Sequence, residues 1–217
     1  MRILDGKMNN TERAESITEA LKKSRPNAKS ELTHKNPLEF MVAVILSAQA
    51  TDKSVNLATP SLFEKFKTAK DYGSASVDDV SAFIRSINFY KTKAERITKA
   101  CQYLVANFNG KVPSDVSDLV KIPGIARKSA NVISQEIFNV VEGIVVDTHV
   151  TRVSQRLKFT KEKTAEKIEK DLMNIVPKKF WKDFGVQIVL HGRYVCLAKN
   201  PKCLNCPVNK WCPSAKF

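Results

Sequence analysis

The sequence has no long hydrophobic run. The longest, residues 40–46, is far shorter than the roughly 20 apolar residues that span a bilayer. The N-terminal segment lacks the apolar stretch of a secretory signal, and neither glycine-rich nor serine-rich linkers occur. We therefore expect a globular protein of the cytoplasm, without a membrane span, in which thiols stay reduced.

Acidic residues are few beside basic ones. The 217 residues include 36 Lys and Arg against 22 Asp and Glu, which gives a formal net charge of +14 and a pI near 9.6. Such an excess favours polyanionic partners, nucleic acid before acidic membrane surfaces. Apolar residues at 43% and charged residues at 27% are ordinary for a chain that buries its own core, so long-range disorder is excluded.

Strand patterns are scarce as well. Only residues 143–146 look strand-like, and a segment of that length makes no sheet. Helical periodicity and capping signals predict helices over residues 11–23, 38–48, 91–110, 161–175 and 180–194, one from Pro123-Gly124 to about 138, and further starts near residues 51, 76 and 114. The helix over 38–48 opens with Asn36, Pro37 and Glu39 and is apolar on nearly every face, so we expect it in the middle of the fold. The predicted fold class is all-α.

Four of the five cysteines cluster near the C-terminus. Cys196, Cys203, Cys206 and Cys212 have the spacing C-x6-C-x2-C-x5-C. Structural zinc sites usually combine two C-x2-C pairs across a longer finger. The spacing here favours a compact 4Fe-4S cluster held by four thiolates, with zinc as the alternative. Cys101, among apolar neighbours in a predicted helix, is interpreted as a buried spectator.

The cysteine loop also carries positive charge. Lys199, Lys202 and Lys210 lie within it, and Arg193 directly precedes it. Metal binding would fix these cations on one face. That face is either an ordinary solvated surface or one that contacts phosphates.

A second motif covers residues 119–132. Two helical segments meet at the turn formed by Ile122, Pro123, Gly124, Ile125 and Ala126. Glycine lets the backbone approach another molecule closely, and free amides at the start of the second helix form an anion site, to which Arg127 and Lys128 add charge. The pattern indicates a helix-hairpin-helix that grips a DNA backbone without reading its sequence. An ordinary helix–helix corner is the alternative, with similar weight on the turn alone.

Lys128 is a candidate nucleophile. An amine at a helix start beside Arg127 is expected to have a pKa below the reference of about 10.4, so that more of it is neutral. Asp147 follows later, after a short apolar stretch. It can cap the next helix and can also serve Lys128 as a base or an electrostatic stabiliser, and the two roles are compatible.

Together these motifs resemble the endonuclease III family of helix-hairpin-helix DNA glycosylases. The resemblance runs from about residue 36 to 212 and rests on Leu46-Ser-Ala-Gln-Ala-Thr-Asp52, Ile122-Pro-Gly-Ile-Ala-Arg-Lys128, Val146-Asp-Thr-His149, His191-Gly-Arg193 and the cysteine loop. It implies a six-helix domain with the hairpin over residues 30–140. It also implies an iron-sulfur cluster domain built from residues 1–29 and 141–217, with DNA across the cleft between the two. We expect a monomer associated with the nucleoid.

The resemblance also implies an activity. Lys128 would attack the sugar of a damaged nucleotide, displace the base and form a Schiff base, with Asp147 assisting, and β-elimination would then cut the strand. The substrate would be double-stranded DNA that contains an oxidised or ring-saturated pyrimidine, such as thymine glycol, or an abasic site. The base must first be flipped out of the stack.

Further DNA contacts follow from the same resemblance. Gln49 would fill the gap that the flipped base leaves, and Phe89 would act as a wedge against the opposite strand. Because Ile87 and Tyr90 adjoin it, Phe89 could instead be a core aromatic. The remaining expected DNA contacts are Pro123, Gly124, Ile125, Ala126, Arg127, Thr148, His149 and Arg193.

The chain departs from the family pattern in places. Ala126 stands where the hairpin usually has a second glycine, and Asn88-Phe89 stands where Gly-Leu is common. The two rival functions are a monofunctional mismatch or adenine glycosylase of the same superfamily and a non-catalytic iron-sulfur DNA-binding protein. The first type usually lacks the lysine that Lys128 matches, and the second has no use for a lysine paired with Asp147.

Overall fold

The computed structural model describes residues 8–216, and every regular element within that range is a helix. The all-α prediction is therefore confirmed. None of these helices is both long and apolar enough to cross a membrane. The chain divides into two compact units, one formed by Ser30–Val140 and the other by Met1–Lys29 together with Val141–Phe217.

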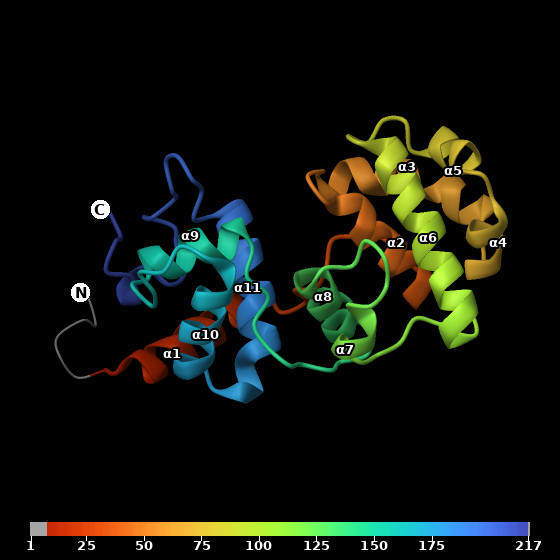
Figure 1. Ribbon diagram of the computed structural model, residues 1–217. Coiled ribbons are helices and arrows are strands. Elements are labelled where there is room, and N and C mark those ends of the chain that lie inside the picture. Colours follow the sequence, from red (N-terminus) through yellow and green to blue (C-terminus); the bar gives the residue numbers. More distant parts are fainter. Residues whose placement is uncertain (1–7, 217) are drawn as a thin grey trace. The chain divides into compact units, whose positions relative to one another are not determined.

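The Ser30–Val140 unit is built around a buried central helix. Its helices are α2 (Pro37–Ser47), α3 (Asp52–Lys65), α4 (Ala69–Ser74), α5 (Val77–Phe83), α6 (Tyr90–Phe108), α7 (Val116–Leu119) and α8 (Arg127–Ile137) (Figure 1). All side chains of α2 from residue 40 to 46 are buried, as its uniform hydrophobicity predicts. Asn36 caps α2, because its Oδ1 accepts a 2.9 Å hydrogen bond from the N–H of Glu39. Helices α3, α6 and α8 all pack against α2.

The second unit combines the two ends of the chain. It contains α1 (Asn10–Ser24), α9 (Thr148–Arg156), α10 (Ala165–Ile175), the 3-10 turn η1 (Lys178–Phe180), α11 (Trp181–Tyr194) and the 3-10 turn η2 (Asn209–Trp211). Helix α11 packs against both α9 and α1. The hydrophobic core of this unit includes Ile17, Leu21, Val150, Phe184 and Ile188.

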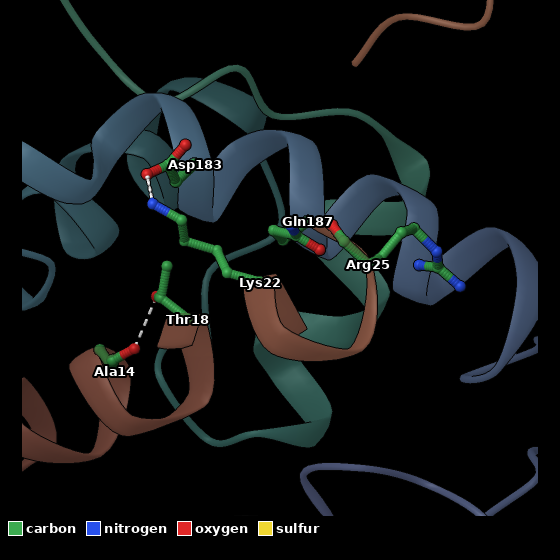
Figure 2. A network of polar contacts seen from close by, with 6 residues as sticks. All are labelled: Ala14, Thr18, Lys22, Arg25, Asp183 and Gln187. Carbon is green, nitrogen blue, oxygen red and sulfur yellow. Dashed lines mark hydrogen bonds and ion pairs between the residues drawn. The ribbon is translucent and has the colours of Figure 1, made fainter. Parts of the chain in front are cut away.

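Polar contacts join α1 to α11 within this unit (Figure 2). Gln187, which is buried, donates through Nε2 to the carbonyl of Arg25 at 2.9 Å. That carbonyl belongs to the C-cap residue of α1, so the bond satisfies a group that the helix itself leaves open. Lys22 Nζ also lies 2.6 Å from Asp183 Oδ2, but both side chains are exposed and such pairs contribute little. The hydrogen bond of the buried Gln187 amide therefore does more to hold α1 against α11 than the exposed ion pair does.

Two local expectations differ from the structure. Helix α4 was not predicted, because it has only 6 residues and includes Gly73. Its signal was the capping box between Thr68 and Asp71. Helix α10 begins at Ala165 and not near residue 161.

Candidate functional site

The hairpin predicted at residues 119–132 is present. α7 ends at Leu119, α8 begins at Arg127, and a hydrogen-bonded turn joins them: Ile122 N–H donates to Leu119 O and Ile125 N–H to Ile122 O, each at 3.1 Å. The side chains of Ile122 and Ile125 are buried and anchor this turn in the core. Pro123 is half-buried, whereas Gly124 and Ala126 are exposed.

Gly124 is required by both conformation and space. Its φ is +86°, a region that side-chain-bearing residues rarely adopt. A Cβ placed there would lie 3.1 Å from Arg96 Cβ and 3.3 Å from Arg96 Cγ on α6. The aliphatic part of Arg96 therefore packs against the turn at Gly124, a contact that the sequence did not indicate.

The start of α8 offers free amide groups to a ligand. Its N-cap residue, Ala126, provides no side-chain hydrogen bond, and the first amides of a helix have no partner within the helix. Arg127 and Lys128 are exposed in this first turn. This helix end therefore has no side-chain cap, and uncapped amides beside two cations can bind a phosphate.

Asp147 opens α9 in the other unit. It is the N-cap residue, and its Oδ1 accepts a 2.8 Å hydrogen bond from the N–H of Val150. Its Oδ2 has no hydrogen-bond partner among residues 8–216. One carboxylate oxygen therefore fixes the side chain, and the other remains available for chemistry.

The residues after Asp147 differ in exposure. Thr148 is exposed, and His149 is half-buried against α11. Arg152 Nη2 donates to His149 Nδ1 at 3.1 Å and to the carbonyl of Gly192 at 2.7 Å. A Cβ on Gly192 would lie only 2.8 Å from His149 Cβ, so this glycine sets the close approach of α9 and α11. Arg193, the next residue, is half-buried in the last turn of α11.

Gln49 and Phe89 lie on two loops of the Ser30–Val140 unit. Gln49 is exposed just after α2, with φ 54°. Phe89 is 65% exposed at the start of α6, with φ 58°. This exposure rules out the alternative that Phe89 is a core aromatic, and its neighbour Ile87, 2% exposed, occupies that core position instead.

The four cysteines line one cavity. It has a volume of about 560 Å³, and Cys196, Cys203, Cys206 and Cys212 all contribute to its wall. The loop between them is held by short backbone turns: Cys206 N–H donates to Cys203 O at 3.2 Å and Cys212 N–H to Asn209 O at 3.1 Å. Cys101, in contrast, is fully buried inside α6, and burial raises the pKa of its thiol to about 12. The predicted burial of Cys101 is confirmed.

Two arginines of α9 hold the start of the cysteine loop. Arg156 Nη1 donates to Leu197 O at 2.6 Å and lies 3.2 Å from Cys196 Sγ, and its Nη2 donates to Ala198 O at 2.9 Å. Arg152 Nε donates to Cys196 O at 3.1 Å. Sequence reasoning missed both arginines, because nothing in a helix sequence names a partner that lies 40 or more residues away.

The four thiols that line this cavity are donors for a metal group. Thiolates bind both zinc and iron-sulfur clusters. Burial raises the pKa of Cys206 to about 11 and also raises that of Cys212. A metal group must therefore displace thiol protons when it binds.

Comparisons with known proteins agree with this geometry. A model of the family described as "HhH-GPD superfamily base excision DNA repair protein" matches residues 42–178. A model of the "Iron-sulfur binding domain of endonuclease III" matches residues 196–212, a range that starts and ends on a cysteine.

Relatives and solved structures match most of the chain. Endonuclease III of Synechocystis sp. is 41% identical over 205 residues, which cover 94% of each chain. Endonuclease III of Escherichia coli is 40% identical over 205 residues, 94% of this chain and 96% of the relative. The structure of a trapped covalent intermediate of an endonuclease III with DNA is similar with a TM-score of 0.88 at 41% identity, covering 96% of this chain and 98% of the other.

Proposed function

Because this chain belongs to the endonuclease III family, it is a base-excision-repair DNA glycosylase and abasic-site lyase, and we propose that Lys128 and Asp147 perform its chemistry. The observation that carries the proposal is the placement of Lys128. Its amine is exposed in the first turn of a helix whose free amides can bind a phosphate of the same strand.

The proposed reaction begins with the Lys128 amine. Its lone pair forms a bond to the sugar C1′, and the damaged base leaves with the electrons of the glycosidic bond. The departing base takes up a proton, and the amine, now bonded to C1′, gives one proton away. The sugar ring then opens as O4′ is protonated, which leaves a protonated Schiff base between Lys128 and C1′. Loss of a proton from C2′ then expels the 3′ phosphate oxygen, which cuts the strand on the 3′ side, and water releases Lys128.

Asp147 is proposed to act through its unoccupied oxygen. The bond from Oδ1 to the Val150 amide at 2.8 Å fixes the carboxylate, so Oδ2 keeps one orientation. A fixed negative charge stabilises the positive charge that develops on the sugar as the base departs, and it can accept a proton from the amine. The role as cap and the role in catalysis use different atoms.

The proposed substrate is double-stranded DNA that contains an oxidised pyrimidine of the thymine glycol type or an abasic site. The hairpin would bind the backbone through the amides at the start of α8 and through Arg127, without reading sequence. Thr148, His149 and Arg193 are proposed as further backbone contacts. Gln49 and Phe89, both exposed on loops, are proposed to occupy the space left by the flipped base and to unstack the opposite strand.

The iron-sulfur cluster of the family is proposed to be a 4Fe-4S cube held by Cys196, Cys203, Cys206 and Cys212. The shared cavity and the match of residues 196–212 to the iron-sulfur binding domain of endonuclease III support it. The cluster would supply the metal–thiolate bonds that close the loop. We accordingly propose that Met1–Lys29 and Val141–Phe217 form the iron-sulfur cluster domain and that Ser30–Val140, which holds the helices α2 to α8 with the short and unpredicted α4 among them, corresponds to the six-helix domain of the family.

Borohydride trapping on a duplex with one thymine glycol tests the function. The wild type should release the base and form a covalent complex that borohydride preserves. Lys128→Gln should abolish the complex while DNA affinity stays within about tenfold, because only one cation is lost. Asp147→Asn should keep the cap and slow base release by about 10²-fold or more. Full lyase activity in Lys128→Gln would assign the reaction to another amine.

A further inference from the structure

A lysine is buried in the core of the Ser30–Val140 unit. Lys93 is 2% exposed, although it lies on α6 among the apolar residues of the buried face, Ile97, Cys101 and Leu104. Burying an amine costs free energy unless it finds a hydrogen-bond acceptor. An apolar side chain of similar length would fill the same space without this cost, so the amine needs a reason other than packing.

The acceptor of that amine is the end of another helix. Lys93 Nζ donates to the carbonyl of Leu46 at 2.8 Å, and Leu46 lies in the last turn of α2. Carbonyls of a last turn have no partner within the helix, and a cation there is also favoured by the helix dipole. The Lys93 amine thus caps the C-terminal end of α2, directly before Ala48 and Gln49.

Lys93 also lies at the start of α6, close to Phe89. Its N–H donates to the carbonyl of Phe89 at 3.0 Å, the hydrogen bond that starts α6. Phe89 has no side-chain cap hydrogen bond to define this helix start. Lys93 therefore links the first turn of α6, which follows Phe89, to the last turn of α2, which leads to Gln49.

We propose that Lys93 is a positioning residue that holds the Gln49 and Phe89 loops at a fixed separation. The two loops need this separation to keep a damaged base out of the DNA double helix. The inference rests on the proposed function, because it uses the roles of Gln49 and Phe89 in the duplex. Lys93 itself is buried and does not touch DNA. Its effect is confined to substrates in which a base must be removed from a stack.

This confinement defines the experiment. Base release from a thymine glycol duplex requires both loops, whereas cleavage of a single-stranded abasic oligonucleotide requires Lys128 but no unstacking. Lys93→Met removes the amine and keeps the length of the side chain. It should lower the duplex rate about tenfold to hundredfold, the scale of a misplacement of about 1 Å, and leave the single-strand rate unchanged.

Two further variants separate positioning from general effects. Lys93→Arg keeps a cationic donor and should restore most of the duplex rate. Lys99→Met removes a charge from the same helix, but Lys99 is exposed, and its Nζ lies 2.7 Å from Glu95 Oε1. It should behave as the wild type in both assays.

The outcomes decide between the explanations. Equal losses on duplex and single-strand substrates, or no loss on either, would overturn the inference. A wild type that is inactive on both overturns the proposed function as well, whereas an active wild type matched by Lys93→Met overturns only the role of Lys93. Should Lys93→Met fail to fold, Lys93→Gln, which keeps a neutral donor, is judged by the same ratio of the two rates.

Discussion

Truncation of Phe89 to alanine separates a role in DNA from a role in the core. A fully buried phenylalanine cut to alanine costs about 3–5 kcal/mol. Phe89 is 65% exposed, so only about a third of the burial free energy of its ring is at stake, roughly 0.5–1 kcal/mol. For a chain of this size that corresponds to a fall in melting temperature of no more than about 4 °C.

The expected loss of activity is larger. Stacking of a base on an aromatic ring is worth about 1–3 kcal/mol. At about 1.4 kcal/mol for each factor of ten, the rate of base release from duplex DNA should fall about 5- to 150-fold. Cleavage of an abasic single strand, in which no opposite base must be displaced, should not change.

Val105→Ala is the matched control. Val105 is an exposed apolar residue of the same helix, at 42% exposure, and about 24 Å along α6 from Phe89 at the usual rise per residue. It should leave both rates unaltered. A fall of about 10 °C or more in the melting temperature of Phe89→Ala would contradict its exposed position. An unchanged duplex rate would remove Phe89 from the proposed site.

Three further predictions concern the hairpin, the cysteines and a helix cap. Gly124→Ala should cost about 1–2 kcal/mol of stability and also weaken DNA binding in fluorescence anisotropy, because its Cβ would press on Arg96. Gly110→Ala, at φ +74° but with only Ala69 Cβ nearby at 3.8 Å, should lose stability alone. Cys206→Ser should lose the visible absorbance and most of the roughly four irons per chain, whereas Cys101→Ala should keep them, and equimolar zinc in an active wild type would contradict the cluster. The pKa of Asp71 is lowered, chiefly by the Thr68 N–H, so its stabilisation is full above the unfolded pKa of about 3.9 and is lost as the pH falls below it. Asp71→Asn should therefore flatten the loss of stability as the pH falls below about 4 in urea unfolding.

Local chemistry explains which elements the sequence predicts. The start of α2 is predicted by Asn36, Pro37 and Glu39, because each of these residues acts within one helical turn of its own position. Asp147 is expected as a cap, and its Oδ1 accepts the Val150 amide for the same local reason. Helix α4 was not predicted, because it is too short to show a helical hydrophobic period, although its capping box is present in the sequence.

Contacts between distant segments set the limit of such predictions. Arg156 donates a hydrogen bond to the carbonyl of Leu197, and Lys93 donates one to the carbonyl of Leu46. Neither pairing can be predicted from the spacing of residues in the sequence. A partial signal existed for Lys93, since a charged residue in register with Ile97 and Leu104 falls on the buried face of α6. Such a residue indicates a buried partner without naming it.

Positive φ angles need separate explanations at the two proposed DNA loops. Gln49 follows the C-cap of α2, and Asn109 and Asn139 lie at comparable helix ends, where the left-handed conformation is common. The φ of Gln49 is therefore explained by capping alone. Phe89 stands at a helix start, where an extended backbone is usual, and an aromatic residue adopts a left-handed φ only when its surroundings impose it. Buried Ile87 anchors the chain before Phe89, the Lys93 N–H donates to the Phe89 carbonyl after it, and the aromatic ring between these two anchors is 65% exposed.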